Sequence, residues 1–258
     1  MLQEKSIMII YQNKLIKLIT FFLFLLFLIV GLLTFKDYGL TIDEEFQRAS
    51  GFYWLKYVLQ FTPFEILKAS VDEIFSRPRH FTLPPPETYN QWGVIFDLPM
   101  AFVETIFEVN DSKNYYHLRH FFNFLLFFIS SIYFFKLLLK RFSEYQISLI
   151  GTLFYILSPR IYGNSFYNNK DLVFLSLLVI AIYYCLKLLD KTNFKNLILF
   201  SFFAAVCTAS RVIGIFLLLS FILFHFLSLR IEDFKLKSFK IPLMCGLFYF
   251  IFLILLWP

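Results

Sequence analysis

The 258-residue chain is 59% hydrophobic, its mean hydropathy is +0.69, and its apolar residues form long runs rather than alternating with charge. This composition excludes an ordinary soluble domain and predicts an all-α, polytopic membrane protein. The net charge of +6 does not indicate nucleic-acid binding, because the basic residues flank the apolar runs, where the positive-inside rule places them.

The apolar runs predict seven membrane passes and a cytoplasmic N-terminus. Residues 197–229 are too long for one pass, since a helix of 33 residues would span about 50 Å against a hydrocarbon core of ~30 Å. This run also carries Arg211, whose burial in lipid is unfavourable, so we place a turn there. The basic segment 230–240 then lies on the cytoplasmic side. The predicted passes are residues 18–34, 118–139, 147–161, 172–189, 197–210, 212–229 and 241–258.

The first outer loop, residues 35–117, opens with three consecutive acids shortly after the first pass. These are Asp43, Glu44 and Glu45. One interpretation is a helix start, with Thr41 or Asp43 as the cap and the two glutamates favoured by the helix dipole. The other is the working end of an active site, in which a carboxylate accepts a proton from a hydroxyl group.

A second helix is predicted later in the same loop, over residues 91–109. Its apolar side chains recur at spacings of three and four, with Asp97, Glu104 and Glu108 on the other side. It is too charged to cross a membrane and is suited to lie on the membrane surface. The proline-rich segment 77–86 is expected to connect it to the first helix of the loop.

The segment SPRIYGNSFYNNKD, residues 158–171, is predicted to form one short outer turn that holds Arg160, Lys170 and Asp171. One interpretation is anchoring at the membrane interface, where basic side chains extend toward water. The other is an anion site, because two cations, loop amides and the start of the next helix suit a phosphate.

Two more arginines belong to this outer set. Arg211 lies in the TASRVIG turn, where an arginine needs a partner, and Asp171 or a bound anion would supply one. A purely structural ion pair is the alternative. Arg119, which opens the second pass in HLRH, is a weaker member of the same set.

Metal and disulfide sites are not indicated by the sequence. His117 and His120 are three residues apart, but no metal-binding motif accompanies them. The three cysteines lie inside apolar runs and form no CxxC pair.

Together these features predict one outer pocket that combines acids with cations, as a transferase with a lipid-phosphate donor requires. The order of features resembles the GT-C class of membrane glycosyltransferases, specifically the dolichyl-phosphate-mannose protein mannosyltransferase and aminoarabinose transferase superfamily. The resemblance rests on the acidic motif after the first pass, on YNQWGVIFDLPMAFVETIF followed by YYHLRHFFN, and on the SPRIYGNSFYNNKD and TASRVIG segments. It covers nearly the whole chain, so residues 1–258 are expected to form one GT-C-like module.

The resemblance implies a role for each of these residues. Asp43 would be the catalytic base and Glu44 its supporting acid. The residues expected at the donor phosphate are Arg160, Lys170, Arg211 and Arg119, supported by Asp171 and Asn164.

The resemblance also implies the reaction and its location. The donor would be a polyprenyl-phosphate sugar, transferred with inversion to a glycan, lipid or protein on the periplasmic face of a bacterial inner membrane. No cofactor is expected, and no metal, since no second DxD-like motif is present.

Two alternatives remain open. Intramembrane charges are also typical of a transporter or lipid flippase, although here the charges gather at one interface and no inverted repeat is visible. The chain also ends at LLWP, where family members continue, which favours a truncated, non-catalytic remnant as the third hypothesis.

Overall fold

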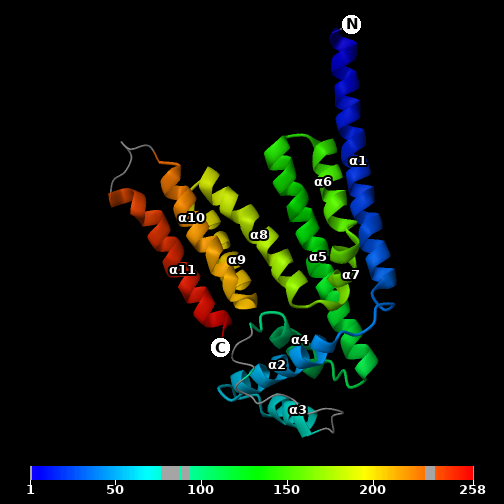
Figure 1. Ribbon diagram of the computed structural model, residues 1–258, viewed down its shortest axis with the longest axis vertical. Helices are drawn as coiled ribbons and strands as arrows, with labels where there is room; N and C mark the ends of the chain where they lie inside the picture. Colours follow the sequence, from blue (N-terminus) through cyan, green and yellow to red (C-terminus); the bar gives the residue numbers. More distant parts are fainter. Residues whose placement is uncertain (1, 77–87, 89–92, 230–235, 258) are drawn as a thin grey trace.

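The computed structural model describes residues 2–76, 88, 93–229 and 236–257, and these residues form helices and connecting segments without a strand. Figure 1 shows a bundle of helices side by side, with a layer of three further helices across one end. The bundle helices are α1 (Leu2–Thr34), α5 (Ser112–Phe142), α6 (Tyr145–Ile156), α8 (Asp171–Asp190), α9 (Phe194–Ser210), α10 (Ile215–Leu227) and α11 (Lys240–Leu256). The end layer consists of α2 (Ile42–Leu59), α3 (Glu65–Ser76) and α4 (Asp97–Ile106).

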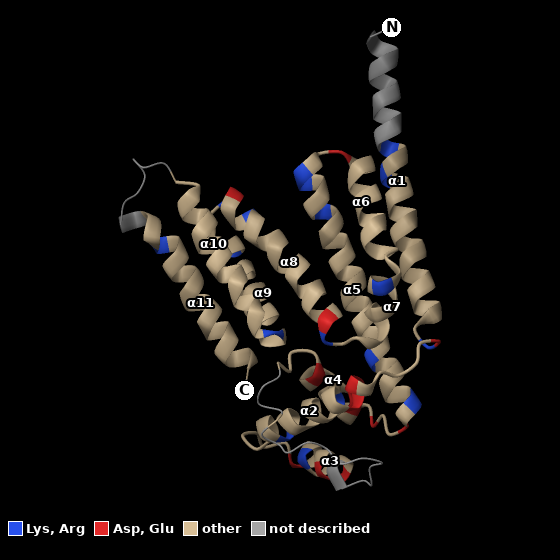
Figure 2. Cartoon of the chain, viewed as in Figure 1, with Lys and Arg blue, Asp and Glu red and all other residues tan. Residues whose placement is uncertain are grey.

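The apolar character of the bundle helices supports a membrane location. Three of them are long and apolar enough to cross a bilayer: residues 14–34 of α1, and all of α5 and α8. The helices α6, α9, α11 and the segment 212–227 are apolar but shorter. Figure 2 shows the charged residues mostly near the ends of the helices, with uncharged middles. The seven membrane passes stay a prediction.

The break predicted at Arg211 is present. Helix α9 ends at Ser210, Arg211 has an extended backbone (φ −147°, ψ 131°), and a short 3-10 turn, Val212–Gly214, leads into α10. The long apolar run is therefore two helices, and its arginine lies at the end of the bundle.

Two apolar clusters hold the bundle together. In the first, Phe200, Phe221 and Tyr249 are fully buried among α8, α9, α10 and α11. Small residues along α9, including Ala204 and Ala205, let the neighbouring helices approach closely. The second cluster joins α1, α5, α6 and α8 with a further short helix, α7 (Pro159–Tyr167).

The predicted amphipathic helix is confirmed but shorter, and its acidic face is buried in the protein. Helix α4 covers Asp97–Ile106, while Trp92 and the connector 77–86 lie outside the described residues. Asp97 and Glu104 are buried, whereas Phe102 and Ile106 are 39% and 49% exposed. The charged face points inward because Arg119, which is buried, and Arg48 lie there to pair with it.

Candidate active site

The three acids at the start of α2 have different environments. Thr41 caps the helix, and its backbone N–H and hydroxyl both donate to Glu44 Oε2, at 2.7 and 3.3 Å. Glu44 is 1% exposed, which is consistent with a supporting role rather than contact with substrate. Asp43 is exposed and lines a cavity, so it is the acid of this pair that a ligand can reach.

That cavity has a volume of about 150 Å³ and lies where the end of the bundle meets α2. It brings together Asp43 from α2, Lys170 and Asp171 from the start of α8, and Arg211 from the end of α9. Four asparagine and glutamine side chains complete much of its polar wall. They are Gln47, Asn164, Asn168 and Asn169.

The two cations of the cavity lie near acidic side chains. Arg211 pairs with Asp171, one of the two partners that the sequence left open for this arginine. Burial lowers the pKa of Lys170, and the neighbouring Arg211 lowers it further, while the charges of Asp43 and Asp171 act in the opposite direction. An anion bound between Lys170 and Arg211 would relieve the repulsion between these two cations.

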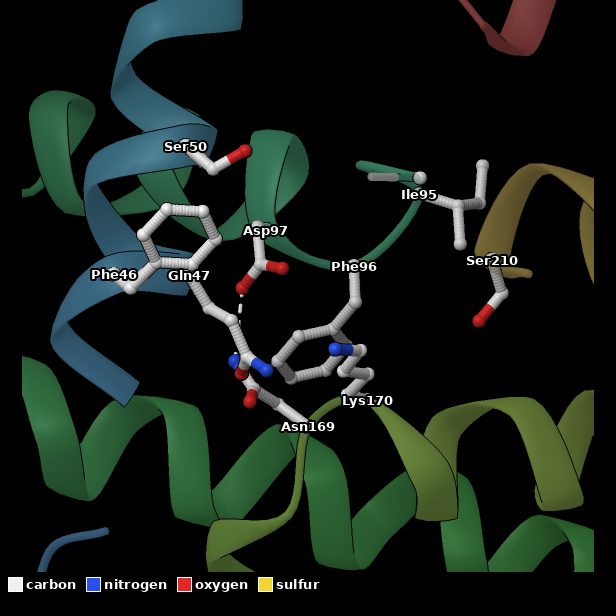
Figure 3. Close-up of a pocket in the computed structure, with 10 residues that line it drawn as sticks. Phe46, Gln47, Ser50, Ile95, Phe96, Asp97, Asn169, Lys170 and Ser210 are labelled. Carbon is white, nitrogen blue, oxygen red and sulfur yellow. Dashed lines mark hydrogen bonds between the residues drawn. The ribbon is translucent and has the colours of Figure 1, made fainter. Parts of the chain in front are cut away.

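A narrow recess adjoins the cavity and shares three of its lining residues, Gln47, Asn169 and Lys170 (Figure 3). The recess extends between α2 and the start of α4, where Asp97 forms part of its wall. Asn169 Nδ2 donates to Asp97 Oδ1 over 2.8 Å. The cavity is thus connected through one hydrogen bond to the buried charges beneath it.

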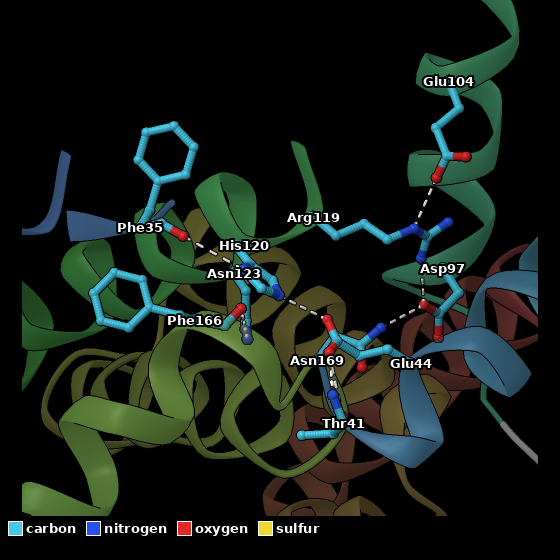
Figure 4. Close-up of polar contacts among 10 residues, drawn as sticks. All are labelled: Phe35, Thr41, Glu44, Asp97, Glu104, Arg119, His120, Asn123, Phe166 and Asn169. Carbon is cyan, nitrogen blue, oxygen red and sulfur yellow. Dashed lines mark hydrogen bonds and ion pairs between the residues drawn. The ribbon is translucent and has the colours of Figure 1, made fainter. Parts of the chain in front are cut away.

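Those buried charges form a network of two arginines and two acids between α2, α4 and α5. Arg119 donates from Nε to Glu104 Oε1 (2.7 Å) and from Nη1 to Asp97 Oδ1 (2.9 Å), as Figure 4 shows. Arg48 donates from Nε to the other oxygen of Glu104, at 2.8 Å. The formal charges balance, which is the condition under which buried ions are tolerated.

Arg119 therefore lies in this buried network and not in the outer pocket where the sequence predicted it. It is 1% exposed, and both of its acidic partners are also buried. It anchors α4 to α5 and does not line the cavity of Asp43. Its Nε and Nη1 are bound to Glu104 and Asp97, and the role predicted for it at the donor phosphate stays a prediction.

Arg160 is likewise not brought to the cavity. The segment predicted as one short turn is mostly helix α7, which Pro159 opens. A helix of nine residues is roughly 13 Å long, so it separates Arg160 at its start from Lys170 beyond its end. Arg160 is exposed and does not belong to the cavity lining. Asn164, one turn further along α7, does belong to it.

Sequence reasoning missed His120. Its Nε2 lies 2.8 Å from Glu44 Oε1, and its Nδ1 lies 3.4 Å from the carbonyl oxygen of Phe35 (Figure 4). This imidazole therefore ties the start of α2 to α5 and to the end of α1. The available signal was the HLRH motif itself, since polar groups that open a buried helix need partners and the loop before it is rich in acids.

A metal site is not assembled by the described part of the chain. Among those residues, no group of three or more His, Cys, Asp and Glu side chains lies where it would hold a metal ion. The expected metal-independence of the reaction stays a prediction.

Comparison with known protein families identifies the chain's relatives. The family of dolichyl-phosphate-mannose-protein mannosyltransferases matches residues 100–257, more than half of the sequence. The chain belongs to this family. It is accordingly a membrane glycosyltransferase of the mannosyltransferase-like kind, as the resemblance predicted. No curated protein and no solved structure matches it significantly.

The residues that match the family include both cations of the cavity but not Asp43. Lys170, Asp171 and Arg211 lie within it, whereas α2 with Asp43 precedes it. The tertiary structure therefore supplies the link between the two groups, because both line one cavity.

Proposed function

We propose that this protein transfers a sugar from a polyprenyl-phosphate carrier to an acceptor hydroxyl at the cavity of Asp43. The observation that carries the proposal is the joint lining of that cavity by the exposed carboxylate of Asp43 and two cations, Lys170 and Arg211. The lipid phosphate would lie against the cations, and the acceptor hydroxyl near Asp43.

The reaction follows from this placement. Asp43 accepts the proton of the acceptor hydroxyl, whose oxygen attacks the anomeric carbon of the donor. The bond from that carbon to the phosphate oxygen breaks, and the phosphate leaves with the bonding electrons. Lys170 and Arg211 stabilise the charge that develops on the phosphate. Attack from the side opposite the leaving phosphate inverts the anomeric centre.

Several neighbouring groups hold the reacting residues in position. Glu44 and His120 fix the start of α2, where Asp43 directly precedes Glu44. Asp171 holds Arg211 in place through their ion pair. A catalytic group needs such support, since small displacements of a reacting group lower the rate strongly.

Asp43→Asn tests the proposal. The substitution removes the proton acceptor and keeps the shape of the side chain, so transfer should fall at least a hundredfold. Glu45→Gln, two residues along the same helix start, is the matched control and should retain activity. The assay measures release of polyprenyl phosphate from a panel of lipid-phosphate sugars. Near-normal transfer by Asp43→Asn, with normal thermal unfolding, would remove Asp43 from the mechanism.

We further propose that the cavity opens to the periplasmic side of a bacterial inner membrane. Ile42, beside Asp43, is 97% exposed and suits a cysteine label, because the three native cysteines are buried. Ile42→Cys should react with a membrane-impermeant maleimide in spheroplasts. Glu144→Cys, in the exposed turn between α5 and α6, should react only after lysis. The reverse pattern would contradict the proposed orientation.

A further inference from the structure

The recess beside the cavity carries buried polar atoms that nothing in the described protein satisfies. Gln47 Oε1, Ser50 Oγ and Asn169 Oδ1 are without a hydrogen-bond partner in the described part of the chain. All three residues line the recess, and their exposed fractions are 8%, 3% and 5%. Buried polar atoms are nearly always paired, so three unpaired ones around one small space point to a ligand.

The chemistry of that ligand follows from the orientation of Asn169. Its amide nitrogen donates to Asp97, which also accepts from the buried Arg119. The amide is therefore fixed with its oxygen as the unpaired group in the recess (Figure 3). The unpaired oxygen of Asn169 can only accept, so the ligand group that meets it must donate. A phosphate oxygen does not, but a hydroxyl group does.

The size of the recess limits how much of the ligand enters it. Its volume is about 30 Å³, which is room for roughly two groups the size of a water molecule. A whole sugar ring does not fit, but two neighbouring hydroxyl groups on one edge of the ring do. The larger cavity of about 150 Å³ lies alongside and shares Gln47 and Asn169 with the recess.

We propose that Gln47, Ser50 and Asn169 form a subsite that binds two hydroxyl groups of the transferred sugar. The ring lies in the cavity of Asp43, with its phosphate toward Lys170 and Arg211. Phe46 and Phe96, which also line the recess, provide apolar surface for the ring carbons. This assignment rests on the proposed function, and it makes the recess a determinant of which sugar is accepted.

Ser50→Ala is the test, because it deletes a hydroxyl that has no hydrogen-bond partner among the described residues. A merely structural role predicts unchanged or slightly higher stability and no effect on ligands. The subsite predicts a selective loss of sugar binding. The probes are a short-chain polyprenyl phosphate and the same lipid phosphate carrying mannose, glucose or galactose, with affinity measured on the full chain in nanodiscs.

The wild-type protein should bind at least one sugar-carrying lipid more tightly than the bare lipid phosphate. Ser50→Ala and Gln47→Leu should each weaken binding of that lipid roughly threefold to tenfold, the effect of one lost hydrogen bond. Neither should change the affinity for the bare lipid phosphate. Ser176→Ala is the matched control, since Ser176 Oγ is also buried and unpartnered among the described residues but lines neither space.

Three results would overturn the subsite. One is equal affinity of the wild type for the bare and all the sugar-carrying lipids. Another is a loss on Ser50→Ala that is the same for both kinds of lipid, and a third is no loss on either variant. Absence of binding of any lipid phosphate to the wild type would instead refute the proposed function, and the subsite with it.

Discussion

Replacing Arg119 by Met tests the buried ion network beneath the site. The substitution keeps most of the side-chain volume and removes the cation that touches both Asp97 and Glu104. Glu104 retains Arg48 at 2.8 Å, but Asp97 keeps only the amide of Asn169. Asp97 is therefore left without a counterion, which costs about 3–5 kcal/mol at a pH well above 7, where its carboxyl group is ionised.

The position of that charge gives the prediction a second part. If it resides on Asp97, then Asp97→Asn should partly rescue Arg119→Met. The double variant should be more stable than Arg119→Met alone, because an amide carries no charge to compensate. If the uncompensated charge resided on Glu104 instead, Asp97→Asn would not restore the stability of Arg119→Met.

The measurement is the apparent unfolding temperature in detergent, followed by size-exclusion chromatography after heating. Arg119→Met should lower it by roughly 6–20 °C. Lys56→Met is the control, since its ion pair with Asp72 is half exposed on both sides and should contribute under about 1 kcal/mol. The reasoning is refuted if the two variants behave alike, or if Asp97→Asn lowers the stability of Arg119→Met further.

Three further predictions concern the same region. Burial raises the pKa of Asp97 from 3.8 to about 7, so between these pH values the folded protein keeps a proton that the unfolded chain has released. The free energy of unfolding should therefore fall as the pH rises from about 4 to 7. Asp97→Asn should flatten the plot of unfolding temperature against pH. A Cβ on Gly51 would lie 2.3 Å from the backbone oxygen of Asp97, so Gly51→Ala should destabilise the protein by roughly 1–3 kcal/mol. Gly246→Ala is the control, because a Cβ there would meet no neighbouring group within 4 Å among the described residues. Equal unfolding temperatures of the two variants would contradict this prediction. Lys170→Gln and Arg211→Gln should each weaken binding of bare polyprenyl phosphate about tenfold, and unchanged affinity in both would place the phosphate elsewhere.

The class of the protein and the helix break at Arg211 could be predicted from the sequence. Long apolar runs can only be buried or placed in lipid, so an all-α membrane protein followed directly from composition. The turn at Arg211 followed from the length of the run and from the unfavourable burial of its charge, and α9 does end at Ser210. The family followed from the order of motifs and is confirmed by the match over residues 100–257.

Which charged groups meet depends on the packing of the helices and could not be predicted from the sequence. Neighbours in sequence separate in space: Asp43 faces the cavity, while Glu44 turns inward to His120, 76 residues away. Arg119 and Arg160 have the same chemistry as Arg211, but one is buried between acids and the other lies at the start of helix α7, away from the cavity. Local pattern gives each residue its helix and its face. The partner of a charge depends on how helices pack, and that packing follows from contacts between residues far apart in the chain.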